Sequence, residues 1–210
     1  TRYKMSYYDL CLQKTSEQIR EKAEELGWNA TNCDFETVFL EADDWGELKR
    51  KIGQNREEAD ILVFRGGEGQ LNRKAAEDSR VDVLLHPEKG RKDSGVNHAI
   101  AKEAAKNNVA IGFDFRMLDA SEKTRSHILR HWGRNLMLCE KYDAPYIMTS
   151  GAKEEFDLRA PRDLASIIDS LGYDGSEAVS EFPEKILERA ERVKEEGFVR
   201  PGQKVTGDGE

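Results

Sequence analysis

The strongest constraint on the fold is a repeated alternation between short apolar runs and longer segments with helical periodicity. Several of these runs, such as Ile61–Phe64, are continuously apolar, as expected for strands that are covered on both faces. The seven predicted strands are Ser6–Leu12, Trp28–Cys33, Glu36–Glu41, Ile61–Phe64, Val81–Leu85, Val109–Phe115 and Pro145–Met148. The predicted helices lie near 16–26, 44–54, 69–78, 95–107, 121–141, 161–171 and 183–196.

Strands that alternate with helices and short turns indicate an α/β fold with a parallel sheet built from βαβ units. The number of strands favours an irregular TIM-like (β/α) barrel of about seven parallel strands, with an open doubly wound sheet as the alternative. We expect one barrel domain over residues 1–197 and a flexible C-terminal tail over 198–210. Within the domain, Ser94 is predicted to cap a helix that enters at Gly95, and Pro161 and Gly172 to begin and end another.

The charge of the chain is unevenly distributed. The sequence holds 41 acidic and 33 basic residues, a formal net charge of −8, which argues against nucleic-acid binding over the whole surface. The section 61–163 is mildly basic, however, and both flanking sections are acidic. The sequence shows neither a long apolar run nor an apolar signal core at its start, so we expect a cytoplasmic protein without membrane contact. Its three cysteines are expected to be reduced.

The predicted helix 121–141 carries cations on one face and apolar residues on the opposite face. The cationic face comprises Lys123, His127, Arg130, Arg134 and Lys141, and no acidic residue falls among them. Outer faces usually mix charges of both signs, so this one-sign stripe suggests phosphate binding, although an ordinary exposed helix is an equal alternative. Arg125 lies on the apolar side and is expected to point toward the barrel mouth near Asp114 and Arg116. An ion pair between Arg125 and Asp114 is the structural alternative.

Signals for catalysis are weak. The turn at 66–69 has neither of the glycine spacings of nucleotide-binding loops. The histidines offer no H-x-H or H-E-x-x-H pattern, and neither a nucleophile with its base nor a metal cage is visible. Further cations follow strands or precede a helix, where phosphate contacts are favoured: Arg65, the basic loop 89–92, Lys153, Arg159 and Arg162.

Four segments carry a resemblance to a known family. They are Val81–Glu88, Asp93–Arg116, Arg134–Lys153 and Asp157–Leu164, and the similarity extends over most of residues 60–196 and more loosely over 1–55. The sequence resembles the archaeal ribonuclease P protein component 3 family, whose eukaryotic relative is the thirty-kilodalton ribonuclease P subunit. This resemblance implies a TIM-like barrel related to the polymerase-and-histidinol-phosphatase (PHP) metal hydrolases. Those hydrolases have H-x-H on the first strand, where this chain reads Asp9-Leu10-Cys11, so their metal site is not expected here.

The resemblance also implies a function. It predicts an accessory subunit of ribonuclease P, the ribonucleoprotein whose RNA removes 5′ leaders from precursor tRNA, paired with the ferredoxin-like protein component 2. The protein itself is expected to hold no catalytic residue, metal or cofactor, and the RNA to use Mg²⁺. Lysine and arginine on a rigid scaffold neutralise phosphates, and the planar guanidinium binds them bidentately. The predicted RNA-binding residues are Arg65, Arg73, Lys74, Arg116, Arg125, Arg130, Arg134, Lys153, Arg159 and Arg162.

Two other functions remain open at this point. One is a metal-dependent phosphoesterase-like barrel enzyme with an unusual site at His86, Glu88 and Asp114. The other is a scaffold for protein interactions, on which the cationic stripe is incidental.

Overall fold

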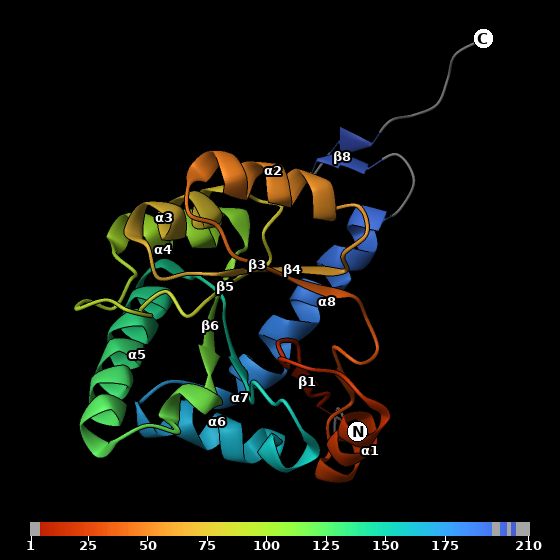
Figure 1. Cartoon of the computed structure of the whole chain (residues 1–210), viewed down its shortest axis with the longest axis vertical. Coiled ribbons are helices and arrows are strands. Elements are labelled where there is room, and N and C mark those ends of the chain that lie inside the picture. Colours follow the sequence, from red (N-terminus) through yellow and green to blue (C-terminus); the bar gives the residue numbers. More distant parts are fainter. Residues whose placement is uncertain (1–4, 195–197, 201–202, 205–210) are drawn as a thin grey trace.

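A computed structural model of the chain describes residues 5–194, 198–200 and 203–204. Its centre is a five-stranded parallel sheet with the strand order β3-β4-β5-β6-β7 (Figure 1). The strands are β3 (Thr37–Leu40), β4 (Ile61–Arg65), β5 (Val83–Leu85), β6 (Ala110–Asp114) and β7 (Tyr146–Thr149). The helices that connect them in turn are α2 (Trp45–Asn55), α3 (Gly69–Glu77), α4 (His98–Asn107) and α5 (Glu122–Tyr142). Because sequential strands are parallel neighbours, their carboxyl ends meet at one edge of the sheet.

Both faces of this sheet are buried, which explains the continuously apolar strands of the sequence. One face packs against α2–α5; its residues include a row of register partners that runs across all five strands, namely Leu40, Phe64, Leu84, Ile111 and Tyr146. The other face builds a second core with the segment after β1 and with α8 (Glu181–Lys194). In Figure 1, α8 crosses behind the sheet, while α2, α3 and α4 gather on its opposite side.

The N-terminal section forms a separate two-stranded parallel pair. It comprises β1 (Tyr8–Asp9), α1 (Glu17–Leu26) and β2 (Ala30–Thr31). The closed barrel predicted from the sequence is therefore not confirmed, because ladder hydrogen bonds join five strands and β1–β2 stand apart within the described residues. Side chains connect the two sheets instead: Thr37 Oγ1 donates to the Leu10 carbonyl at 3.4 Å, and Asp9 contacts the end of β7. All seven predicted strand positions contain a parallel strand; β4 is one residue longer than predicted, and the others are shorter than or shifted from their predicted bounds.

The C-terminal section is helical. It comprises α6 (Pro161–Ser170), α7 (Gly175–Val179) and α8, and two short 3₁₀ helices, η1 (Phe115–Leu118) and η2 (Glu155–Asp157), precede α5 and α6. Of the tail expected over 198–210, β8 (Phe198–Arg200) and β9 (Gln203–Lys204) form an antiparallel pair, and the rest lies outside the described residues. None of the described helices is both long enough and apolar enough to cross a bilayer.

Helix boundaries follow capping side chains. Pro161 is the first residue of α6, as predicted, and Gly172 follows that helix with a left-handed backbone. The predicted cap at Ser94 is wrong, because the chain between Ser94 and α4 is not helical. Asn97 caps α4 instead: its Oδ1 accepts from the amides of Ala99 and Ile100, both at 3.0 Å.

Candidate nucleic-acid interface

Asp114 organises the carboxyl edge of the sheet. Its buried carboxylate lies 2.9 Å from His86 Nε2, accepts from Gln13 Nε2 at 3.1 Å, and accepts from the Arg116 amide at 2.9 Å. His86, which directly follows β5, holds this position with a left-handed backbone, a conformation that is uncommon for residues other than glycine. The structural alternative of an ion pair between Asp114 and Arg125 is therefore wrong: Asp114 contacts His86 and accepts a hydrogen bond from the Arg116 amide in η1.

Asp9 forms a second buried polar connection at the same edge. Its carboxylate accepts from Ser150 Oγ at 2.6 Å, from the Ser150 amide at 2.9 Å, and from the Thr149 hydroxyl. Burial raises the pKa of Asp9, and these three donors oppose the shift. Because this one carboxylate accepts hydrogen bonds from the last residue of β7 and from the residue that follows it, Asp9 acts as a structural bridge between β1 and β7.

The residues named for the alternative enzyme do not converge. The Glu88 carboxylate forms no hydrogen bond with His86 or Asp114 and instead accepts from Trp132 Nε1 of α5 at 2.9 Å. Burial raises the pKa of Glu88, and the second oxygen of this carboxyl has no hydrogen-bond partner. The described part of the chain contains no group of three His, Cys, Asp or Glu side chains placed to hold a metal ion. This geometry gives no support to a phosphoesterase centre at His86, Glu88 and Asp114.

Four of the ten predicted RNA-binding residues are paired with carboxylates inside the protein. Arg73 Nε lies 2.7 Å and Lys74 Nζ 2.8 Å from the two oxygens of Glu77 on α3. The others are Arg65, which contacts Glu41 at 3.3 Å and lies over the Phe39 ring, and Arg116, which pairs with Asp157. These internal acids already neutralise much of the positive charge of the four side chains.

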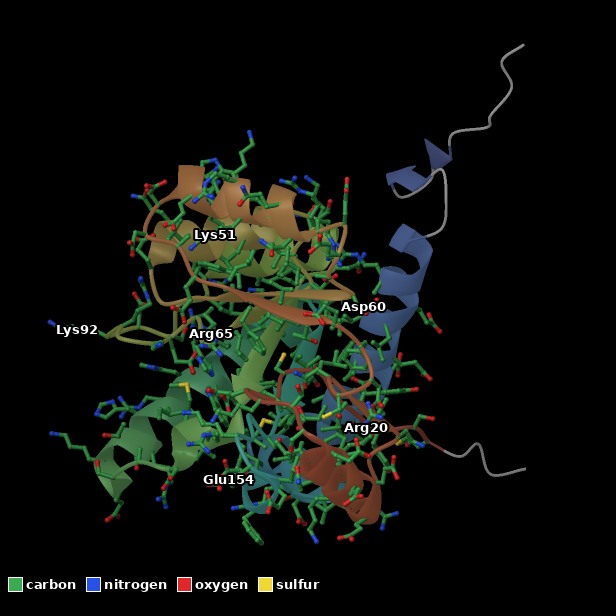
Figure 2. The ribbon with its side chains drawn as sticks, turned by 45° about the vertical axis from the view of Figure 1, so that its right-hand side comes forward. Arg20, Lys51, Asp60, Arg65, Lys92 and Glu154 are labelled. Carbon is green, nitrogen blue, oxygen red and sulfur yellow. The ribbon has the colours of Figure 1, made fainter. Side chains whose placement is uncertain are left out.

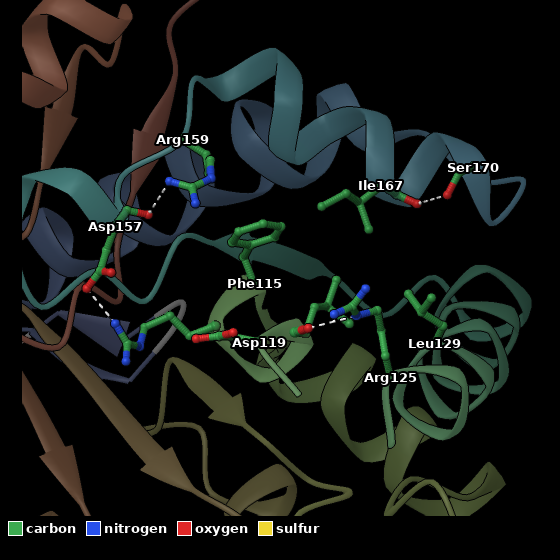
Figure 3. Close-up of a pocket in the computed structure, with 10 residues that line it drawn as sticks. Phe115, Asp119, Arg125, Leu129, Asp157, Arg159, Ile167 and Ser170 are labelled. Atoms are coloured by element: carbon green, nitrogen blue, oxygen red, sulfur yellow. Dashed lines mark hydrogen bonds and ion pairs between the residues drawn. The ribbon is translucent and has the colours of Figure 1, made fainter. Parts of the chain in front are cut away.

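Arg125 and Arg159 face neutral partners instead. Arg125 donates from Nε to the Leu118 carbonyl at 2.9 Å and from Nη2 to the Ala120 carbonyl at 3.1 Å. Arg159 Nη1 donates to three consecutive carbonyls in and after η2, and the guanidinium lies 5.2 Å from the Phe115 ring centre. Both arginines line one pocket of about 590 Å³ between η1, the start of α5, and α6 (Figure 3). Arg125 therefore does lie near Arg116, as expected, because Arg116 lines the same pocket.

The remaining four predicted residues, Arg130, Arg134, Lys153 and Arg162, are exposed, and none forms an ion pair with an acid among the described residues. Arg130 and Arg134 belong to the cationic face of α5, hereafter the α5 stripe: Lys123, His127, Arg130, Arg134 and Lys141. Every member of the α5 stripe is exposed, and no described carboxylate pairs with any of them. The α5 stripe is thus a solvent-facing row of cations without internal neutralisation.

Two further features of this surface were not among the predicted sites. Phe156 in η2 leaves 78% of its surface exposed, although it is a large aromatic residue. Lys92, in the loop before α4, points into solvent without a described acidic partner (Figure 2). Its neighbour Arg91 instead pairs with Asp93 at 2.7 Å and lowers the pKa of that carboxyl to about 2. The basic composition of loop 89–92 already indicated Lys92, whereas no sequence signal marks Phe156 as exposed.

Comparisons with known proteins give a consistent picture. A family model described as "RNase P subunit p30" matches residues 34–195. Ribonuclease P protein component 3 of Methanococcoides burtonii is 35% identical over 237 aligned positions, which cover 97% of this chain and 98% of the relative. The protein of the same name from Methanothermobacter thermautotrophicus is 34% identical over 177 positions, covering 81% of this chain and 72% of the relative.

One solved structure has a similar fold. A chain in a cryo-EM structure of archaeal ribonuclease P with mature tRNA superposes with a TM-score of 0.75 at 24% sequence identity. The superposition covers 100% of this chain and 91% of the other.

Proposed function

Because the chain belongs to the RNase P subunit p30 family, we propose that it is a non-catalytic protein subunit of ribonuclease P that binds and supports the catalytic RNA during 5′-leader removal from precursor tRNA. The observation that carries this proposal is the α5 stripe, a row of exposed cations that no described carboxylate neutralises. The His86–Asp114 pair at the carboxyl edge, in contrast, is satisfied internally. The chemistry is therefore assigned to the RNA and its Mg²⁺, and the protein contributes fixed positive charge.

The mode of RNA binding follows from this charge distribution. Unpaired arginines displace counterions from phosphates, and rigid placement on one helix fixes the spacing of those contacts. The net charge of −8 works against RNA contact elsewhere on the surface. We assign the main RNA contacts to Arg130 and Arg134, with Lys153 and Arg162 as further contacts. The residues already paired with acids, such as Arg73 and Lys74, are assigned a smaller share.

A second protein is part of the proposal. The acidic flanking sections of the sequence are unsuited to RNA, and an opposing basic protein surface would complement them. We assign that role to the ferredoxin-like component 2, and the site of action to the cytoplasm. The proposed kinship with the barrels of the PHP hydrolases is supported by seven parallel strands in two sheets, bridged at Asp9 without ladder hydrogen bonds. Where those hydrolases have H-x-H, the first strand here places a carboxylate that three hydroxyl and amide donors already satisfy.

Reconstitution of the holoenzyme tests the function. Cleavage of precursor tRNA at limiting Mg²⁺ should fall when the chain is omitted, and it should fall in the same direction with the double variant Arg130→Glu/Arg134→Glu. The matched control is Lys49→Glu/Arg50→Glu, an equal charge change at exposed positions of α2. Cleavage that does not depend on the chain would overturn the proposal. Cleavage that requires the chain but tolerates the Arg130/Arg134 reversal would instead identify it as a scaffold for protein interactions.

A further inference from the structure

The pocket of about 590 Å³ beside α5 combines an apolar floor with a cationic rim. Four apolar side chains form the floor: Phe115, Leu118, Leu129 and Ile167. Figure 3 shows Phe115 between Arg159 on one side and Arg125 on the other, with Ile167 of α6 facing them from above. A volume of this size lies within the range of about 300–1,000 Å³ that is usual for pockets that hold small organic groups.

The rim carries a net positive charge, because its three arginines outnumber Asp119 and Asp157. Of its three arginines, Arg116 is neutralised by Asp157. Arg125 and Arg159 donate only to backbone carbonyls, which orient the guanidinium groups without removing their charge. The remaining acid, Asp119, is exposed and forms no ion pair with a described cation. The rim thus presents two oriented guanidinium groups toward whatever occupies the pocket.

Charge and shape together select the occupant. An apolar protein side chain would cover Arg125 and Arg159 without compensating their lost hydration, which is unfavourable. A free inorganic phosphate would satisfy the arginines and leave the apolar floor unused. A nucleotide uses both parts, because its base has an apolar face and its phosphate accepts hydrogen bonds from a guanidinium in a bidentate way.

We infer that this pocket binds one unstacked nucleotide of a single-stranded RNA segment, with the base on the Phe115 side and the phosphate on Arg125 and Arg159. The inference rests on the proposed function, since it specifies how the RNA is held at a second place on the surface. The guanidinium of Arg159 already lies 5.2 Å from the centre of the Phe115 ring, so an ordered stacking surface exists before any ligand arrives. Phe156, exposed and one residue before Asp157, supplies a second aromatic ring on which a neighbouring base can stack.

Titration of the full chain with 5′-AMP and 5′-UMP, followed by NMR chemical shifts, tests the pocket directly. Both nucleotides should bind and shift the resonances of Phe115 and Ile167, because stacking tolerates different bases. Arg125→Gln should weaken binding about tenfold, the loss expected for one charge-assisted hydrogen bond. Ser170→Leu, which fills the pocket without changing its charge, should remove the shifts. The control is Arg50→Gln at an exposed position of α2, which removes one guanidinium away from the pocket and should leave nucleotide affinity unchanged.

The outcomes separate this inference from the proposed function. Equal affinity for inorganic phosphate and 5′-AMP would reduce the pocket to an anion site and overturn the inference. Loss of component 2 binding in Ser170→Leu, without any nucleotide binding to the unsubstituted chain, would identify a protein contact and also overturn it. If ribonuclease P RNA binds normally to the Arg125 and Ser170 variants but not to Arg130→Glu/Arg134→Glu, the proposed function stands and the pocket inference fails. If nucleotides bind the pocket but cleavage by the holoenzyme does not depend on the chain, the pocket inference stands and the proposed function fails.

Discussion

Two glycines with similar backbone conformations allow the contribution of Asp114 to the stability of the fold to be measured. Gly151 (φ +62°) and Gly90 (φ +72°) both have the left-handed conformation, which destabilises an alanine by about 1–2 kcal/mol. A Cβ at Gly90 would meet nothing within 4 Å, whereas a Cβ at Gly151 would lie 2.0 Å from Oδ1 and 2.5 Å from Cγ of Asp114. Alanine at position 151 therefore has to displace the carboxylate, and alanine at position 90 displaces nothing.

The expected difference follows from the partners of Asp114. The carboxylate contacts His86 and Gln13 and holds the Arg116 amide, and each hydrogen bond to a charged group contributes about 1.5–3 kcal/mol. Losing one of these bonds in addition to the backbone strain makes Gly151→Ala about 3–5 kcal/mol less stable. Since about 1 kcal/mol shifts the melting temperature of a chain of this size by about 2–4 °C, we expect losses of about 6–20 °C for Gly151→Ala and about 2–8 °C for Gly90→Ala.

Thermal unfolding monitored by circular dichroism measures both variants, and a double-mutant cycle with Asp114→Ala identifies the cause. Removing the carboxylate removes the clash, so Gly151→Ala should lower the melting temperature in the Asp114→Ala background by no more than Gly90→Ala does in the native one. Equal losses for the two glycine variants, or full additivity in the cycle, would refute the idea that Asp114 holds this edge of the sheet together.

Three other predictions concern charge and burial. Arg134→Ala should reduce the slope of log affinity against log salt concentration for ribonuclease P RNA by about 0.7–0.9. Arg73→Ala should change this slope less, because Glu77 already pairs with Arg73. Equal slope changes for the two variants would contradict this prediction. Burial raises the pKa of Glu88, so the folded state favours the protonated form of this side chain. The stability of the native chain therefore falls as pH rises through the folded-state pKa of Glu88. The free energy of unfolding of Glu88→Gln, measured by urea titration, should therefore rise relative to that of the native chain between about pH 4 and about pH 8. A difference that does not depend on pH would contradict a raised pKa of Glu88. A thiol reagent should modify the half-buried Cys33 in the native chain but react with the buried Cys11 and Cys139 only after unfolding. Equal modification rates for all three cysteines would contradict the burial of Cys11 and Cys139.

The α5 stripe shows what the sequence can predict about a site. Helical periodicity alone places its five members on one face, and the structure finds all of them exposed. The same reasoning could have excluded Arg73 and Lys74 as free cations, because Glu77 lies four and three residues later on one helix and pairs with both.

Contacts at the carboxyl edge were beyond reach of the sequence for a physical reason. Asp114 contacts His86 across 28 positions of the chain only because β5 and β6 are register neighbours. Arg125 donates to the Leu118 carbonyl of the unpredicted 3₁₀ helix η1. Whether the strands close into a barrel depends in the same way on contacts between distant strands, which the pattern of apolar residues does not reveal. Strand positions are fixed by apolar runs, but the junction between β1 and β7 depends on one carboxylate and its three donors.

The two cationic surfaces on either side of α5 differ in what they can recognise. The α5 stripe offers unpaired charge on an exposed helix face, so under the proposed function it would contact phosphates without distinguishing between bases. The pocket at Arg125 and Arg159 adds an apolar floor, so it favours a strand whose base has left the stack. Because the rest of the molecule carries a net negative charge, an approaching RNA is repelled from most orientations and attracted in those that bring it to α5. Under the proposed function, selectivity for folded RNA would come from the position of these cations, and a uniform increase in positive charge would strengthen binding while removing that selectivity.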